Sequence, residues 1–251
     1  MLRASGLTDR FARAKLPPVK VILFGATGMI GQGVLRECLL DPRVERVLVV
    51  TRNATGREHA KLQEIVHVDF ADLSGIEAEL AGYDACFYCL GVSSVGMSEA
   101  EYTRVTFDYA MAAGRVLARL SPAMAFVFIS GGGTDSSEKG RSMWARVKGK
   151  TENELLALPF EAAFMFRPAM IIPMHGITSR TRLYRVLYTI ISPLHPFLKL
   201  VAPSIVTTTD NVAKAMLLVA SNGAGAGGAK KRVLENRDIN DLVASARSES
   251  V

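Results

Sequence analysis

The sequence predicts an α/β protein built on a doubly wound parallel sheet, and three observations lead to that prediction. Short, almost wholly apolar runs alternate with longer runs of helical periodicity. The first apolar run, residues 19–25, leads directly into three glycines at three-residue spacing. The chain has 251 residues, of which 49% are hydrophobic, and this is enough to bury one sizeable core.

The strands and helices are expected in the alternating order that gives parallel strands. Apolar runs of this kind are typical of strands covered by helices on both faces. Beyond Pro168 the alternation loosens, and within 204–220 we expect only a short strand and a helix capped by Asp210. The other strands are expected at residues 19–25, 46–51, 64–69, 84–91, 124–130, 162–168 and 232–236, and the other helices at 29–40, at 98–120, around Trp144 and from Asp238.

Composition excludes several classes of protein. The formal net charge is +6, but residues 1–20 hold five basic side chains against one acidic one, so the remainder carries only about +2, too little for a nucleic-acid-binding surface. We expect 1–18 to be a flexible basic tail, although it also faintly resembles an organellar transit peptide, and 19–251 to be a single domain. Proline and histidine interrupt the apolar stretch 186–198, so no integral membrane span is expected.

The three cysteines suit a reducing compartment, and a cytoplasmic location is therefore expected. Cys86 and Cys89 form a CxxC, a spacing found in many metal and redox sites. Here the CxxC lies in an apolar run that is expected to be a buried strand, where residues three apart face opposite sides of the sheet. We therefore expect no metal site.

The stretch "GATGMIGQG" predicts a dinucleotide-binding turn. Its three glycines follow a strand and open a helix, where glycine permits the tight turn, the close approach of a pyrophosphate and the packing of the helix on the strand. The N-terminus of that helix offers N–H groups to phosphates. The residues expected to contact the dinucleotide here are Gly25, Ala26, Thr27, Gly28, Met29, Ile30 and Gly31.

Residues after the next three strands extend this site. Arg52 stands where an NAD-specific site has an acidic residue, so we expect NADP(H) rather than NAD(H); the alternative is a solvated loop arginine. Asp69 is expected to accept a hydrogen bond from the adenine amino group, to cap the following helix, or both. The neighbouring contacts are expected from Phe70, Leu90, Gly91 and Val92.

The motifs "GATGMIG", "VTRN", "VDFADL", "CLGVSS", "FISGGGTDSS", "VKGKTENEL", "FRPAMII" and "VLENRDINDL" occur in this order over about residues 19–245. These motifs and their order resemble those of the atypical short-chain dehydrogenase/reductases, most closely the branch of the Tat-interacting oxidoreductase-like proteins. The resemblance implies a Rossmann fold that binds NADP(H), with residues 168–251 as a small substrate-side region. The NmrA-like sensors, which bind the cofactor without turning it over, are also similar.

The resemblance also places a catalytic site, and this sequence departs from its pattern. In the family a Ser or Thr after the fifth strand and a Tyr-x-x-x-Lys helix act together. Here the helix reads Trp144 to Lys148, and the family's hydroxyl position falls on Gly131 beside Ser130. Lys148 is expected to hold the nicotinamide ribose, and Arg167 with Pro168 to support the nicotinamide side. An indole N–H does not titrate in water and cannot relay a proton as a phenol does.

Two functions remain open at this point. One is an oxidoreductase or epimerase acting on a small, apolar carbonyl or hydroxyl substrate, with 179–201 as the substrate wall; the other is a catalytically inactive NADP(H)-binding sensor or interaction protein. A weaker third reading is a membrane-surface partner that uses the basic residues of 180–199. A homodimer is also kept open. The catalytic positions are thus Lys148, Ser130 and Trp144. The candidate substitutes for the missing acid and hydroxyl are Ser130, Thr134, Ser136, Ser137, Tyr109, His175, Tyr184 and Tyr188.

Overall fold

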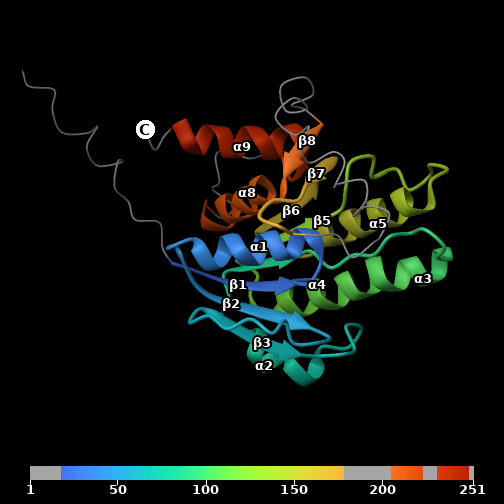
Figure 1. The fold of residues 1–251 in the computed structure, drawn as a ribbon. Coiled ribbons are helices and arrows are strands. Elements are labelled where there is room, and N and C mark those ends of the chain that lie inside the picture. The colour runs from blue at the N-terminus through green and yellow to red at the C-terminus, as the bar shows by residue number, and fades with distance from the viewer. Residues whose placement is uncertain (1–17, 178–204, 223–230, 249–251) are drawn as a thin grey trace, which may run out of the picture.

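The computed structural model describes residues 18–177, 205–222 and 231–248 (Figure 1). The basic tail, the substrate wall at 179–201, Tyr184 and Tyr188 lie outside these ranges, apart from residue 18. Within them, the predicted α/β architecture is confirmed.

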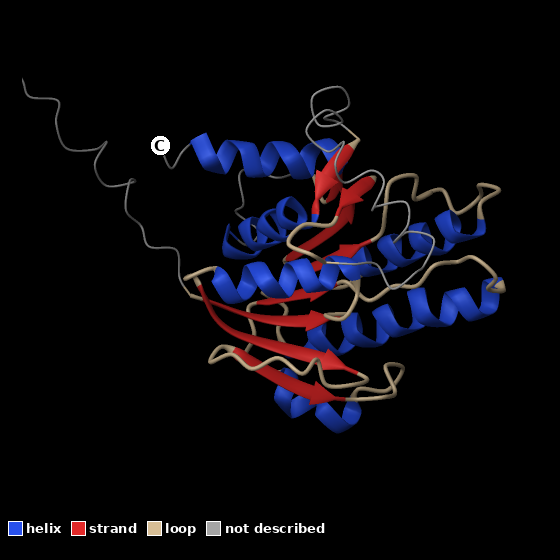
Figure 2. Cartoon of the chain, in the orientation of Figure 1, coloured by secondary structure: helices blue, strands red, loops and turns tan. Residues whose placement is uncertain are grey.

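A seven-stranded sheet forms the centre of the molecule (Figure 2). Its strand order is β3-β2-β1-β4-β5-β6-β9, and every neighbouring pair is parallel. The order reverses direction between β1 and β4, which makes this the topological switch point of the sheet. The strands are β1 Val19–Phe24, β2 Val44–Thr51, β3 Leu62–Val66, β4 Ala85–Tyr88, β5 Ala125–Ile129, β6 Ala162–Arg167 and β9 Val233–Glu235.

Helices cover both faces of the sheet, and each face has its own hydrophobic core (Figure 1). Along β1 the side chains alternate, so that Val21 and Leu23 enter one core while Ile22 and Phe24 enter the other. The first core is closed by α1 Met29–Leu40, α8 Thr209–Asn222 and α9 Asn236–Ser248, and the second by α2 Glu77–Leu80, α4 Tyr109–Leu120 and α5 Met143–Ala157.

The predicted helix at 98–120 is present in three segments. Ser98 caps α3 Glu99–Thr103 in a capping box with Glu101. A π-helical turn over Arg104–Asp108 then joins α3 to α4. Such turns insert an extra residue into the helical ladder, which hydrophobic periodicity does not reveal.

Several element boundaries differ from the sequence prediction. A short strand, β7 Met170–Ile172, was missed; it pairs in parallel with β8 Val206–Thr208 in a separate two-stranded sheet. Asp210 was wrongly expected to cap α8, because the hydroxyl of Thr208 accepts the hydrogen bond from the Asn211 N–H at 3.1 Å and Asp210 lies in the first turn. β3 ends at Val66, three residues early, and α9 begins at Asn236, two residues early.

The cysteine pair behaves as predicted for a buried strand. Cys86 packs in the core beside α4, whereas Cys89, just after β4, packs against the core beside α1, so the two residues face opposite sides of the sheet. Burial raises the pKa of both thiols well above the ordinary value. This pair therefore forms no joint ligand set.

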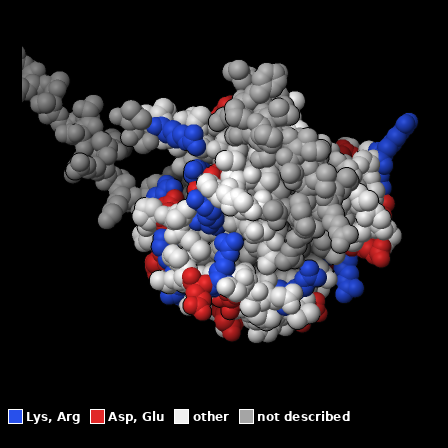
Figure 3. All heavy atoms as spheres, in the orientation of Figure 1, with Lys and Arg blue, Asp and Glu red and all other residues white. Residues whose placement is uncertain are grey.

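The surface agrees with the low charge of the folded body. On the face shown in Figure 3, Lys and Arg side chains lie interspersed with Asp and Glu side chains. Among the described residues, no helix is both long and apolar enough to cross a bilayer.

Candidate dinucleotide-binding site

The predicted cofactor residues gather along one edge of the sheet. Gly25, Arg52, Asp69 and Leu90 follow β1, β2, β3 and β4, and the carboxyl ends of parallel strands lie at the same edge. In open α/β sheets, ligands bind in the crevice outside these ends at the switch point. That point lies between β1 and β4, next to the glycine turn.

Two of the three glycines are required by the fold itself. Gly25 has φ +80°, and a Cβ added there would lie 2.5 Å from the Leu90 backbone nitrogen. A Cβ at Gly31 would lie 2.1 Å from the Gly25 carbonyl oxygen, so Gly31 lets α1 pack onto the turn. These positions bring the ends of β1 and β4 and the start of α1 into direct contact.

Gly28 has a different role from its two neighbours. Its φ of −77° suits any residue, and an added Cβ would meet only the Gly25 oxygen, at 3.3 Å. Gly28 occupies the N-cap of α1 and has no side chain that could accept a hydrogen bond from the first turn. The N–H groups of that turn are therefore offered to an external acceptor, which fits the pyrophosphate of a dinucleotide.

The adenine side is partly built by core packing. Arg52 is exposed directly after β2. The Asp69 carboxylate accepts a hydrogen bond from the Ala71 N–H at 3.0 Å within a local turn. Asp69 therefore does not cap the following helix as expected, because that helix begins only at Ser74. Phe70 is only 3% exposed, and its ring packs edge to face on Phe24 with centroids 6.1 Å apart. Phe70 thus supports the floor of the site from inside the core.

Lys148 is directed from α5 toward the end of β5. Its ammonium group donates hydrogen bonds to the carbonyl oxygens of Ser130, at 2.5 Å, and of Ile129, at 3.3 Å. Burial lowers the pKa of Lys148 to about 8, while the nearby charge of Glu152 opposes this change. Lys148 is therefore a cation whose pKa is about 8, at the edge of the sheet where the cofactor is expected.

Trp144 lies on the same side of α5 and covers the glycine loop after β5. A Cβ added to Gly133 would be 3.6 Å from Cη2 of the indole, within ordinary packing distance. Trp144 and Lys148 therefore both face this loop, as the four-residue spacing predicts. The indole stands where the resemblance implies a phenol, and an indole N–H does not titrate in water as a phenol does.

The backbone at Gly131 explains why a hydroxyl side chain is absent there. Gly131 has φ +145°, a conformation that other residues rarely adopt. Its carbonyl oxygen accepts hydrogen bonds from the Thr134 hydroxyl at 2.7 Å and from the Thr134 N–H at 3.2 Å, and the next N–H, of Gly132, donates to Pro168 at 2.8 Å. The loop is thus fixed in a shape that requires glycine.

Ser130 and Arg167 are held by protein groups rather than left open to a ligand. The Ser130 hydroxyl donates to the Glu152 carboxylate or to the Phe166 carbonyl. Arg167 Nε lies 3.0 and 3.1 Å from the two Glu152 oxygens, and its Nη1 lies 3.2 Å from Glu235. The expected contacts of Ser130 with substrate and of Arg167 with the cofactor stay predictions. In the structure, both side chains belong to an ion-pair and hydrogen-bond network within the protein.

The other substitutes for the missing acid and hydroxyl are distributed around this network. Ser136 accepts a hydrogen bond from Arg167, and the Ser137 hydroxyl donates to Asp135. Tyr109 begins α4, with its ring 6.0 Å from that of Phe70. His175 contacts Asp210 instead, in a separate cluster.

Comparison with known proteins agrees with this geometry. The NAD dependent epimerase/dehydratase family matches residues 21–140, just under half of the chain. The chain is 29% identical over 158 residues to a protein named fmp52, mitochondrial, from Emericella nidulans, and 28% identical over 156 residues to FMP52, mitochondrial, from Eremothecium gossypii. The Emericella match covers 60% of this chain and 66% of the relative, just under two thirds of its length.

Solved structures share the fold over nearly the whole chain. The Bordetella bronchiseptica enzyme WbmF in complex with NAD+ superposes with a TM-score of 0.62 at 14% identity, covering 95% of this chain and 81% of that chain. The Helicobacter pylori ADP-L-glycero-D-manno-heptose-6-epimerase gives 0.61 at 12% identity, covering 93% and 82%. Residues 21–140 thus resemble the NAD dependent epimerase/dehydratase family, and the likeness to the solved structures shows a Rossmann-like α/β fold.

One expectation is corrected by the comparison. The fungal relatives are named mitochondrial proteins, so the expectation of a cytoplasmic location is contradicted. Free buried thiols had suggested a reducing compartment, but a thiol that the core protects from solvent is a weak indicator of compartment.

Proposed function

We propose that this protein is an atypical short-chain dehydrogenase/reductase that binds NADP(H) at the carboxyl edge of its sheet. It reduces a small, apolar carbonyl compound, or oxidises the matching alcohol, with Lys148 as its proton donor and acceptor. The observation that carries this proposal is the glycine turn at the switch point. There the uncapped N-terminus of α1 and the close contact between Gly25 and Leu90 form a cradle that fits a pyrophosphate.

Lys148 is the group on α5 best suited to replace the family's phenol. When bound, NADPH supplies the hydride that the carbonyl carbon accepts. Lys148 gives a proton to the carbonyl oxygen as it becomes negative, so that an alcohol forms, and water then recharges the neutral amine. A pKa of about 8 suits this task because an efficient acid titrates near the working pH. Two of its N–H groups are engaged by Ser130 and Ile129, which leaves a third for a ligand.

The preference for NADP(H) rests on Arg52. Its exposed guanidinium follows β2, the position from which the ribose of a bound dinucleotide is contacted in this fold. A 2′-phosphate pairs with a guanidinium through charge-assisted hydrogen bonds. The WbmF structures are in complex with NAD+ and with NADH, so the proposed preference for NADP(H) rests on Arg52 and not on that neighbour.

The proposal that the substrate is apolar rests on the loop after β4. Val92 is 42% exposed and Val95 is 79% exposed, beside the backbone of Leu90 that closes the glycine turn. Exposed aliphatic side chains at this edge favour an apolar ligand, because covering them removes apolar surface from water.

A binding-only sensor is the second candidate, and two observations favour it. Trp144 packs onto Gly133 at the place of the family's phenol, and the backbone of Gly131 excludes a hydroxyl side chain. Such a protein would keep the cofactor cradle and lose turnover.

Calorimetric titration with NADPH, NADH and their oxidised forms tests the binding step. Gly28→Val is expected to fold, since its backbone is extended, yet to weaken NADPH binding at least tenfold by blocking the approach of the pyrophosphate. Gly75→Val is the matched control, because a Cβ at Gly75 meets nothing within 4 Å. Equal NADPH affinity in the parent and in folded Gly28→Val would refute the proposed site. Turnover of small aldehydes then separates the reductase from the sensor.

A further inference from the structure

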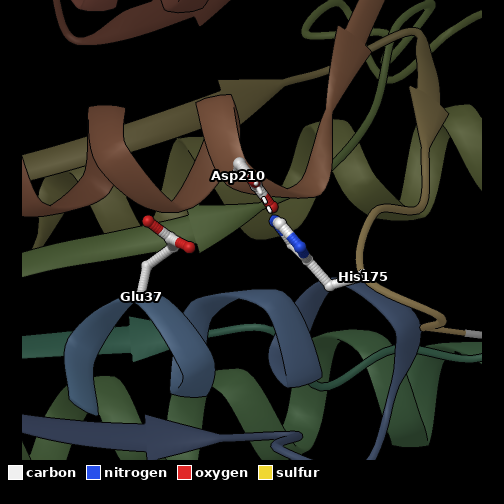
Figure 4. A group of neighbouring side chains, drawn as sticks. All are labelled: Glu37, His175 and Asp210. Carbon is white, nitrogen blue, oxygen red and sulfur yellow. Dashed lines mark hydrogen bonds and ion pairs between the residues drawn. The ribbon is translucent and has the colours of Figure 1, made fainter. Parts of the chain in front are cut away.

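Three potential metal ligands converge away from the glycine turn. Glu37 comes from α1, His175 from the turn after β7, and Asp210 from the first turn of α8 (Figure 4). One ligand atom from each residue lies within 4.8 Å of the other two. His175 Nε2 is 2.7 Å from a carboxylate oxygen of Asp210, and the Glu37 carboxylate points toward the same space.

The fold fixes the backbones that carry these side chains. A Cβ added to Gly33 of α1 would lie 2.7 Å from the Thr209 side chain, so α1 and α8 are in close contact at this point. The Thr209 hydroxyl also accepts a hydrogen bond from the Met174 N–H at 3.1 Å, which ties the turn before His175 to α8. The three ligand-bearing segments are thus held together by contacts that do not involve the ligand atoms.

The environment of the cluster suits a partly desolvated ion. The exposed fractions of the side chains are 10% for Glu37, 17% for Asp210 and 39% for His175. Two shielded carboxylates supply negative charge, and the more open imidazole leaves room for water ligands. A donor set of one imidazole nitrogen and two carboxylate oxygens favours Zn²⁺, Co²⁺ or Mn²⁺ more than a donor set of oxygen atoms alone does.

We propose that Glu37, His175 and Asp210 bind one divalent transition-metal ion, of the zinc class, with water completing its coordination. The ion takes the place of the hydrogen between His175 Nε2 and the Asp210 oxygen, and the neutral imidazole then carries its proton on Nδ1. Glu37 lies eight residues into α1 from Met29, about 12 Å along the helix, so the ion ties α1, α8 and the β7 turn together at a distance from the glycine turn.

Two cations near Glu37 set the expected strength of binding. Arg36 pairs with one carboxylate oxygen of Glu37, and the ammonium of Lys214 lies 3.6 Å from the other. The Lys214 side chain is 41% exposed, so it can move into solvent when an ion enters. Both cations repel a divalent ion, and this predicts that the Lys214→Met variant binds the ion about three- to tenfold more tightly than the parent.

The test uses the full chain, freed of any affinity tag, and titrates Zn²⁺ by calorimetry and Co²⁺ by its visible absorption. We expect one ion per chain in both titrations. His175→Ala and Asp210→Asn are expected to lower affinity at least tenfold, whereas Lys214→Met raises it. His59→Ala removes an exposed histidine elsewhere and is the matched control. Zinc should raise the melting temperature of the parent and leave that of His175→Ala unchanged.

Absence of saturable Zn²⁺ binding below about 100 μM, or parental affinity in folded His175→Ala, overturns the proposal. An equal loss of affinity in His59→Ala overturns it as well, because binding would then be non-specific. If His175→Ala fails to fold, the sign of the Lys214→Met effect decides, since only a site beside Lys214 gains affinity from this change. The outcome does not depend on dinucleotide binding.

Discussion

Arg167 and Glu152 form an ion pair that joins β6 to α5 behind the loop after β5. The Glu152 side chain is 1% exposed and that of Arg167 is 12% exposed. Removing one charge of a buried pair leaves the other uncompensated, and this typically costs about 3 to 5 kcal/mol. Glu235 still pairs with Arg167 in the variant, so we expect Glu152→Gln to lower the free energy of unfolding by about 3 kcal/mol, the lower end of this range, in urea denaturation.

The exposed pair of Arg146 and Glu99 supplies the matched control. Its charged atoms are 2.9 Å apart, but the Glu99 side chain is 56% exposed. Exposed pairs contribute less than about 1 kcal/mol, so Glu99→Gln should barely change stability. Similar losses in the two variants would show that the buried pair has no special role.

Much of the fold was predictable because local patterns and global topology agree. The central strands β1, β4, β5 and β6 are nearly continuous apolar runs, and this composition is typical of strands buried on both faces. The helix at 29–40 was predicted with its observed ends, since a glycine turn opens it and Asp41 with Pro42 follows it. The three-residue strand β7, which was missed, is too short to leave a periodic signal.

Parts of the candidate site depend on long-range contacts that no local pattern records. Arg167 ends a strand and was expected beside the nicotinamide, but its partner Glu152 is fifteen residues away on α5. The backbone of Gly131 adopts its special conformation because the loop contacts Pro168. Glu37, His175 and Asp210 come from distant parts of the sequence, so their convergence could be found only in three dimensions.

Arg52 is predicted to set the cofactor preference. A charge-assisted hydrogen bond contributes about 1.5 to 3 kcal/mol, so Arg52→Ala should reduce the preference for NADPH over NADH by about tenfold to a hundredfold in calorimetric titrations. Arg57→Ala, in the same exposed loop, is the control and should leave the preference unchanged. Equal affinities of the parent for NADPH and NADH would show that Arg52 is only a solvated loop residue.

Lys148 is predicted to set the pH dependence of reduction. An acid must be protonated to act, and burial lowers the pKa of Lys148 to about 8, so kcat/KM should fall above about pH 8. A phenol would sustain the rate to about pH 10. Lys148→Met should abolish the reaction in a folded protein, and a rate that stays flat through pH 9 would contradict the assignment.

The same pKa predicts a change of stability with pH. In the unfolded chain a lysine titrates at about 10.4, above its value in the folded protein. The folded state therefore loses this proton first, and the contribution of Lys148 to stability should rise as the pH increases from about 8 to about 10.4. Thermal unfolding of the parent and of Lys148→Met across this range should show the rise in the parent alone.

Trp144→Tyr is predicted to raise the rate of reduction of small aldehydes, because it places a titratable phenol over the glycine loop. A positioned general acid contributes about 10²- to 10⁴-fold, and a gain of at least tenfold is expected together with a shift of the alkaline limb from about pH 8 toward pH 10. Trp144→Phe, which keeps an aromatic ring at this position but adds no hydroxyl, is the control.

Adding Gly131→Ser to Trp144→Tyr should bring no further gain and should lower the melting temperature, since φ +145° strains any side chain there. If the parent already works at about 10 s⁻¹ and Tyr changes neither its rate nor its pH profile, the proton does not pass through this side of α5. If no variant turns over any substrate while NADPH still binds, the sensor is the correct function.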